Sequence, residues 1–202
     1  MGAVGAVVTP GDLAGPVDEV APALLGCLLD GNGVAVRLTE VEAYAGEGLD
    51  PASHAHRGRT GRSDIMFGPA GRLYVYFTYG MHWCANVVTG PEGRASAVLL
   101  RAGEVVRGHE TARARRPGAA DRDLCRGPAR LARALGLDGA ALGLDLLDAG
   151  SPVRLLPGTH DGTVLAGPRV GVAAGAQTPW RFWIGGEPTV SPYRAAVRRV
   201  RR

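Results

Sequence analysis

One carboxylate in this sequence stands where it could act as a base. Glu42 lies in GVAVRLTEVEAY, residues 33–44, whose alternating residues predict a strand. One face of that strand would carry Val34, Val36, Leu38, Glu40, Glu42 and Tyr44. A carboxylate that ends an apolar face loses hydration, which raises its pKa toward the range of a general base. Taken alone, Glu42 is better explained as an exposed acid at a strand end.

Aromatic and imidazole side chains near Glu42 change that balance. Tyr44 shares its predicted face, and the following loop brings His54 in the sequence SHAH. Tyr76 lies in GRLYVYFTYGMHWCANVV, residues 71–88, where strand alternation places it on the face opposite to Phe77. A planar ligand held between aromatic and imidazole rings, beside one carboxylate, would account for this set.

Packing is the better explanation for several neighbouring residues. The residues expected in the core are Tyr74, Phe77, Trp83, Cys84 and Cys125. His54 and His56 have the H-x-H form of some metal sites, but no further His or Cys cluster completes a ligand set. The sequence therefore predicts no metal site.

Composition narrows the class of protein. The chain has 202 residues, of which 46% are hydrophobic, and no apolar run approaches the roughly 20 residues that span a bilayer. Three separated cysteines fit reduced thiols, so we expect a cytoplasmic protein, associated with the nucleoid if bacterial. A net charge of +4 mildly favours a polyanionic partner. Every basic residue is arginine, so only the N-terminal amine could form a Schiff base.

The expected elements place these residues on one sheet and one loop. Helices are predicted over 18–29, 105–116 and 127–135. Strands are predicted over 33–44, 95–103, 152–156, 163–166, 168–175 and 181–186, with a hairpin between 71 and 89 that turns at 79–81. Residues 45–70 read as a long ordered loop with at most one short helix. No linker is apparent, so 1–202 should form a single domain with flexible ends at 1–15 and 194–202.

Five segments resemble, in order, the alkyladenine (3-methyladenine) DNA glycosylase family. They are EVEAYAGEGLDPASHAHRG, MFGPAGRLYVYFTYGMHWCANVV, AVLLRAGE, DLCRGPARLARALG and RVGV. The resemblance runs from about residue 18 to about residue 192. Its specific part is an E-x-E-A-Y strand followed by Y-V-Y-x-x-Y-G-M and an asparagine. With it we expect an α+β domain, in which a curved antiparallel sheet carries peripheral helices and a hairpin protruding from a basic face.

The resemblance implies a monofunctional DNA glycosylase of base-excision repair. Such an enzyme flips an alkylated or deaminated purine out of the duplex, and water hydrolyses its N-glycosidic bond without a covalent intermediate. The absence of lysine agrees with an enzyme that lacks lyase activity. The implied partner is double-stranded DNA containing damaged purines, with no membrane, no cofactor and no metal, and we expect a monomer.

The resemblance also implies roles for the matching catalytic residues. Glu42 would activate the attacking water. Arg101 and the backbone of Val170 would help to hold that water, and Arg101 would also lie near a phosphate.

Further residues match the positions that recognise the base and the duplex. Tyr44, His54 and Tyr76 would hold the flipped base between their rings, and Asn86 would meet the purine edge and disfavour guanine. Tyr79 would enter the minor groove as a wedge, with Met81 beside it. The loop before His54 is about one residue longer than in the family, which leaves His56 as the alternative stacking ring.

Two other functions are compatible with the sequence. One is a non-catalytic minor-groove DNA-binding protein of the same fold, and the other is an enzyme that acts on free nucleosides. Three loop arginines could contact phosphates, namely Arg57, Arg59 and Arg62. The five arginines from Arg194 onward would add only non-specific attraction.

Overall fold

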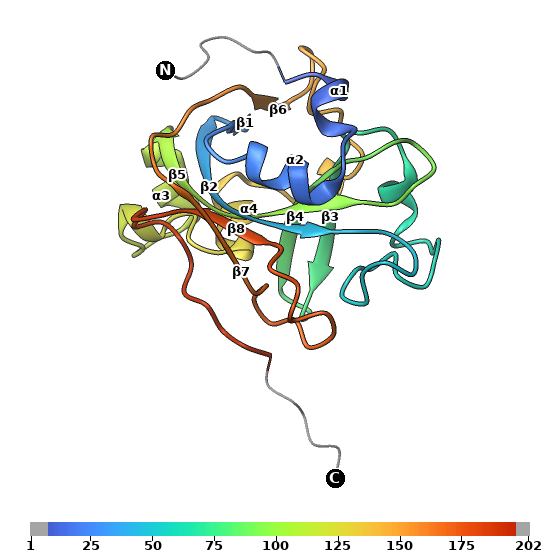
Figure 1. Cartoon of the computed structure of the whole chain (residues 1–202). Coiled ribbons are helices and arrows are strands. Elements are labelled where there is room, and N and C mark those ends of the chain that lie inside the picture. The colour runs from blue at the N-terminus through green and yellow to red at the C-terminus, as the bar shows by residue number, and fades with distance from the viewer. Residues whose placement is uncertain (1–7, 197–202) are drawn as a thin grey trace.

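Two long antiparallel strands, β2 (Val34–Tyr44) and β5 (Ala97–Arg107), form the centre of the computed structural model. The structure describes residues 8–196. The hydrogen-bonded strand order is β3-β4-β5-β2-β1-β6, and β8 pairs with both β2 and β7. All pairs between these strands are antiparallel, and the sheet curls into a half-barrel (Figure 1). The expected α+β class, with one curved antiparallel sheet and few helices, is confirmed.

The remaining elements are short. The other strands are β1 (Leu28–Gly31), β3 (Leu73–Thr78), β4 (His82–Val88), β6 (Val153–Leu156), β7 (Val164–Gly167) and β8 (Arg181–Ile184). The helices are α1 (Pro10–Leu13), α2 (Val17–Ala23), α3 (His109–Arg115) and α4 (Pro128–Ala134), with 3-10 turns η1 (Asp64–Phe67), η2 (Asp121–Asp123) and η3 (Gly139–Ala141). Within residues 8–196 no helix has the length and apolar character needed to cross a membrane.

The main hydrophobic core lies between the curled sheet and its helices. Helix α2 packs on β2, and α4 packs on β4 and β5 (Figure 1). Leu38 of β2, Leu100 of β5 and Leu131 of α4 are all fully buried in this core. Each such leucine contributes roughly 1.5–3 kcal/mol of burial free energy, which stabilises the packing of the helices on the sheet.

Halfway along strand β2, the side chains that point into the main hydrophobic core change from even-numbered to odd-numbered residues. Val36 and Leu38 lie in the main core, but beyond them the core residues of the strand are Val41 and Ala43. The pairing with β5 shifts register between Leu38 and Glu40, and again between Glu40 and Val41. Bulges of this kind re-aim the side chains that follow them. The prediction that Val34 through Tyr44 keep one apolar face is therefore wrong, because alternation restarts at the bulge.

Several predicted elements are confirmed. The strand 33–44, the helix 127–135 and the strands at 152–156 and 163–166 all lie within a residue or two of their expected bounds. The hairpin turns at 79–81 as expected, and the loop over 45–70 contains only η1.

Other boundaries differ for identifiable reasons. Helix α2 ends at Ala23 and not at 29, because the chain turns at Gly26 (φ +83°), where any side chain would meet the backbone of Thr159. Strand β5 runs on to Arg107, which pairs with Ala35, so α3 begins later than the predicted 105. Residues 168–175 form turns and irregular structure and not the expected strand.

The chain ends are partly covered by the structure. Within the range 1–15, helix α1 begins with a capping box between Thr9 and Asp12, and Leu13 is buried. Residues 1–7 and 197–202, with most of the arginine-rich tail, lie outside the described residues.

Candidate active site

Glu42 lies fully buried on β2, at the point where β2 is flanked by both β5 and β8. Its Oε1 accepts a hydrogen bond from the backbone N–H of Val170 at 2.7 Å. Its Oε2 accepts from the hydroxyl group of Tyr44 at 2.9 Å and from Nη1 of Arg101 at 3.3 Å. The interpretation of Glu42 as an exposed strand-end acid is therefore wrong.

The electrostatic surroundings of Glu42 suit a base. Burial raises the pKa of the Glu42 carboxyl above its usual range, and the charge of Glu40 adds to this rise. Arg101, the N–H of Val170 and the hydroxyl of Tyr44 act in the opposite direction and limit the increase. A carboxylate balanced in this way stays a stronger proton acceptor than an exposed glutamate.

Arg101 joins two carboxylates of β2. It is buried and stands at the second register shift between β2 and β5. Its Nε donates to Oε1 of Glu40 at 2.9 Å, its Nη1 to Glu42, and its Nη2 to Oγ of Ser191 at 3.3 Å. The guanidinium plane is thus fixed from three sides, with one edge directed at Glu42.

Glu40 is fully buried and its charge is compensated by two arginines. Nε of Arg181 donates to its Oε1 at 2.7 Å, and Ser191 donates to it from both backbone N–H and Oγ. Buried charges persist in proteins when they are paired and hydrogen-bonded in this way. Sequence reasoning did not single out Arg181 or Ser191, which lie 141 and 151 residues from Glu40 and carry no local signal.

A small cavity of about 80 Å³ collects the predicted base-binding residues. Its lining consists of Tyr44, Ala52, His54, Met66, Tyr74, Tyr76, Asn86 and Ala97. The rings of His54 and Tyr76 meet edge to face, with centroids 4.7 Å apart, and Nδ1 of His54 is 2.9 Å from the hydroxyl oxygen of Tyr74. His54 lines this cavity and His56 does not, which favours His54 as the ring that faces a ligand.

The rings of this cavity are uncharged at neutral pH. Burial, with a smaller contribution from the Arg62 cation, lowers the pKa of His54 to about 4. Burial raises the pKa of Tyr76 and of Tyr44. The cavity therefore presents neutral π-faces and hydroxyl groups, which attract both cationic and neutral planar molecules.

Asn86 and Tyr74 close one side of the cavity together. Asn86 is buried on β4, where it pairs with Tyr74 of β3, and its Nδ2 donates to the backbone carbonyl of Tyr74 at 2.9 Å. This hydrogen bond fixes the orientation of the Asn86 amide in the wall of the cavity. Tyr74, which was expected only in the core, is buried but also lines the cavity.

The tip of the β3–β4 hairpin is exposed and apolar. Tyr79 is 86% exposed and Met81 is 66% exposed. Tyr79 and Gly80 have φ of +52° and +66°, and the N–H of Met81 donates to the carbonyl of Thr78, which is the geometry of a type I′ turn. A tyrosine held at positive φ costs backbone energy, which is typical of functional positions.

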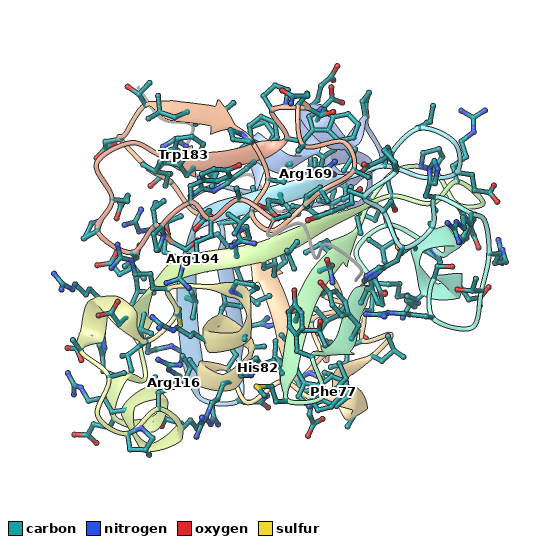
Figure 2. The ribbon with its side chains drawn as sticks, turned by 90° about the horizontal axis from the view of Figure 1, so that it is seen from below. Phe77, His82, Arg116, Arg169, Trp183 and Arg194 are labelled. Atoms are coloured by element: carbon teal, nitrogen blue, oxygen red, sulfur yellow. The ribbon has the colours of Figure 1, made fainter. Side chains whose placement is uncertain are left out.

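The hairpin carries a second exposed aromatic residue near its tip. Phe77 is 47% exposed and packs on Trp83 of the neighbouring strand, with ring centroids 4.9 Å apart. Figure 2 shows Phe77 and His82 at the same end of the hairpin. The expectation that Phe77 lies in the core is wrong, because the hairpin projects beyond the core at this point. Trp83 is partly buried against the core, and Cys84 and Cys125 are buried as expected.

Arginines line two cavities between the carboxylates and the hairpin. The first, of about 570 Å³, is lined by Arg101, Arg116, Arg126, Arg130 and Arg194 with Asp123. The second, of about 550 Å³, is lined by Arg116, Arg130 and Arg133 beside Met81 and Trp83. Five of these arginines are not buried, and we call them the arginine surface: Arg116, Arg126, Arg130, Arg133 and Arg194 (Arg116 and Arg194 are labelled in Figure 2).

The arginine surface carries positive charge that its neighbours do not fully compensate. Asp123 lies within 3.8 Å of both Arg126 and Arg130. Among the described residues that line these two cavities, the carboxylates are Asp123 and Asp138. The pKa of Arg116 is lowered, first by burial and then by the repulsion of Arg130 and Arg133. Repulsion among cations is relieved when an anion such as a phosphate binds between them.

The loop arginines take two different positions. The guanidinium of Arg62 lies 4.9 Å from the ring centroid of Tyr76, so it stands beside the aromatic cavity. Arg59 lies over Phe67 and pairs with Asp64. Within residues 8–196 no three His, Cys, Asp or Glu side chains come together as metal ligands would.

The sequence model of the methylpurine-DNA glycosylase (MPG) family matches residues 12–188. The chain belongs to this family, which confirms the resemblance described from its motifs. It is 56% identical to a protein of Streptomyces avermitilis over 199 residues, covering 94% of this chain and 92% of that one. It is 52% identical to a protein of Nocardia farcinica, covering 96% and 94%. A Frankia casuarinae protein is also 52% identical, covering 87% and 88%, and all three are named "Putative 3-methyladenine DNA glycosylase".

Proposed function

We propose that this protein is a monofunctional DNA glycosylase that removes alkylated or deaminated purines from double-stranded DNA. The observation that carries the proposal is the position of Glu42. Its buried carboxylate is hydrogen-bonded to Tyr44, and Tyr44 also lines the aromatic cavity. A base held in the cavity would thus have its sugar close to a proton acceptor. Membership in the methylpurine-DNA glycosylase family supports the same reaction.

In the proposed reaction, Glu42 takes a proton from a water molecule. The water oxygen then bonds to C1′ of the deoxyribose, and the bond between C1′ and the base breaks with its electron pair leaving on the base. Arg101 and the N–H of Val170 keep the Glu42 carboxylate ionised and oriented. The products are a free base and an abasic site, and no covalent enzyme intermediate is formed. General-base catalysis of this kind contributes roughly 10²–10⁴-fold to the rate.

Base selection in this proposal depends on the aromatic cavity. Tyr44, His54 and Tyr76 present uncharged rings, which stack on any purine and attract a cationic alkylpurine more strongly. An alkylpurine cation departs as a neutral base and needs little acid assistance. Asn86 meets the edge of the base, where the exocyclic amine of guanine would clash or remain unpaired. The names of the relatives make 3-methyladenine the first substrate to test.

Duplex binding would use the hairpin and the arginine surface. Tyr79, with Met81 beside it, is exposed at a turn and fits a wedge that fills the space left by a flipped nucleotide. The arginine surface lies between this tip and Glu42 and fits contacts to the phosphates of the same strand. One wedge and one pocket serve one lesion, so we propose that a monomer is sufficient.

The decisive experiment is single-turnover excision from a duplex with one damaged purine. Duplexes containing 3-methyladenine, hypoxanthine or ethenoadenine are incubated with excess enzyme, and abasic sites are revealed as alkali-labile breaks. Wild-type protein should form them, and Glu42→Gln should be slower by roughly 10²-fold or more while retaining duplex binding. Equal rates for the two proteins would remove Glu42 from its role.

The same assay separates the alternatives. A minor-groove binder without catalysis would bind the duplex and give no abasic sites with any lesion. An enzyme for free nucleosides would release base from the nucleoside and show little loss of activity when salt is raised. Breaks that form without alkali would indicate lyase activity, for which the N-terminal amine is the amine the sequence offers.

A further inference from the structure

Arg169 and Asp50 form a buried ion pair next to the candidate site. Nη1 of Arg169 donates to Oδ2 of Asp50 at 2.6 Å, and its Nη2 donates to Oδ1 at 2.8 Å. Both side chains are at most 1% exposed. Burying such a pair costs desolvation energy that often cancels its attraction, so stability alone is a weak reason for its presence. The contacts that Arg169 and Asp50 make with neighbouring residues indicate a role other than stability.

The pair holds the backbone on both sides of Tyr44. Nη1 of Arg169 also donates to the carbonyl oxygen of Ala43 at 2.9 Å, and Oδ2 of Asp50 accepts from the N–H of Ala45 at 3.2 Å. The guanidinium itself lies 4.6 Å from the ring centroid of Tyr44. Because Arg169 is buried while Tyr44 lines the cavity, Arg169 supports the ring from behind.

Asp50 also organises the turn that presents His54. Its Oδ1 accepts from the N–H of Ala52 at 3.0 Å, and its backbone carbonyl accepts from the N–H of Ser53 at 3.0 Å. The loop of residues 45–58 is thereby tied to the same guanidinium that supports Tyr44. Two parts of the cavity lining, Tyr44 and the turn before His54, thus share one anchor.

Arg169 is joined to the carboxylate by its own backbone. The next residue, Val170, donates its N–H to Oε1 of Glu42 at 2.7 Å. Gly175 closes over the pair, since its carbonyl accepts from Nη2 of Arg169 and a side chain at this position would lie 3.1 Å from that atom. Figure 2 shows Arg169 beside the strands of the sheet.

We propose that Arg169 and Asp50 are positioning residues that set Tyr44 against the bound base and hold the Val170 N–H on Glu42. This inference rests on the proposed function of the site. Neither residue touches the base or the water, and both act through Tyr44, His54 and Val170. Glu42 is faced by Arg101, Glu40, Tyr44 and the Val170 N–H, and the Arg169 cation also acts on it through its charge. In this proposal the pair holds Tyr44 and the Val170 N–H in place.

The primary test is Arg169→Lys, which keeps the charge but loses the two-bond fork and the planar surface behind Tyr44. The matched control is Arg37→Lys, since Arg37 also pairs with two carboxylates, but these are Glu104 and Glu187 and not Glu42. Single-turnover excision by Arg169→Lys should fall by about 10- to 100-fold, as a displacement of about 1 Å costs that much. The acid limb of its pH–rate profile should move to higher pH, because weakening the Val170 bond raises the pKa of Glu42. Arg37→Lys should match wild type.

A measurement that needs no activity separates this inference from the proposed function. The carboxyl ¹³C signal of Glu42 is titrated in wild type and in Arg169→Lys. A higher midpoint in the variant supports the positioning role, even if no lesion tested is excised. An unchanged midpoint overturns it, and so does a lower melting temperature accompanied by an unchanged rate and acid limb.

A second variant covers the case in which Arg169→Lys does not fold. The double substitution Arg169→Gln with Asp50→Asn leaves no unpaired buried charge, so it avoids the main cost of breaking the pair. It should show the same slower excision and the same upward shift of the Glu42 midpoint. Wild-type values for both would contradict the proposal.

Discussion

Tyr44 and Glu42 are linked by a hydrogen bond of 2.9 Å between the tyrosine hydroxyl and Oε2 of the carboxylate. The ring of the same tyrosine lines the aromatic cavity. One side chain therefore connects the place where a base would stack with the group that would activate water. The two functions of Tyr44 can be separated, because the ring and the hydroxyl group are removed by different substitutions.

Tyr44→Phe keeps the ring and removes the hydroxyl donor. Because that hydrogen bond lowers the pKa of Glu42, its loss should raise this pKa further and move the acid limb of the excision rate to higher pH. Affinity for lesion-containing duplex should stay within about twofold, since stacking is retained. A pH series of single-turnover rates tests this, with Tyr193→Phe as the control. An acid limb that does not move would show that the hydroxyl has no influence on the base.

His54 should remain neutral through the physiological range. Its pKa of about 4 predicts that its ring signals, followed by NMR, titrate well below pH 6. Because this pKa lies below the value of about 6.5 in the unfolded chain, the stability that neutral His54 contributes is present above pH 6.5 and is lost as pH falls toward 4. A titration midpoint near 6.5 would mean that the ring is hydrated and does not stand in the cavity wall.

Tyr79→Ala should impair duplex excision without affecting the fold. The side chain is 86% exposed, so the melting temperature should change little. Without a wedge, the cost of holding the nucleotide extrahelical is no longer offset, and excision from duplex should slow by about 10-fold or more. Leu165→Ala, at an apolar residue of β7 that is 42% exposed, is the control. Unchanged excision by Tyr79→Ala would exclude the wedge.

Substitutions in the arginine surface should change the salt dependence of binding. If Arg116 or Arg130 contacts a phosphate, its replacement by glutamine should reduce the slope of log K against log salt by about 0.9. The effect should be equal for damaged and undamaged duplexes, because phosphate contacts carry no base information. Arg72→Gln, whose side chain pairs with Asp145 near the opposite end of the hairpin strands, should leave the slope unchanged. Fluorescence anisotropy at several salt concentrations measures all three.

Local patterns predicted the parts of the fold that depend on neighbouring residues. The hairpin follows from two strand-like runs around Tyr79 and Gly80, and α4 from an apolar pattern that begins at Pro128. Glu42, Tyr44, His54, Tyr76 and Asn86 could be found because they lie in short recognisable motifs. The structure brings all of them to one cavity or to its edge.

Long-range contacts decided what the patterns missed. The end of α2 depends on the approach of Gly26 to Thr159, and the length of β5 depends on its pairing with Ala35. Arg169, Arg181 and Ser191 reach the β2 carboxylates or their neighbours from 119 to 151 residues away. The local sequence around each of these residues gives no sign of such a contact, because the partner that makes its burial possible lies in a distant segment.

The two register shifts around Thr39 and Arg101 set the phase of β2. Upstream of them even-numbered residues face the core, and downstream the odd-numbered residues do. A single-residue deletion at Thr39 would leave every catalytic candidate in the chain, yet it would rotate Glu42 and Tyr44 toward hydrocarbon and bring Val41 and Ala43 into their place. The spacing between Leu38 and Glu42 is therefore as strict a requirement as the identity of Glu42, and length changes in this segment should be tolerated less than substitutions.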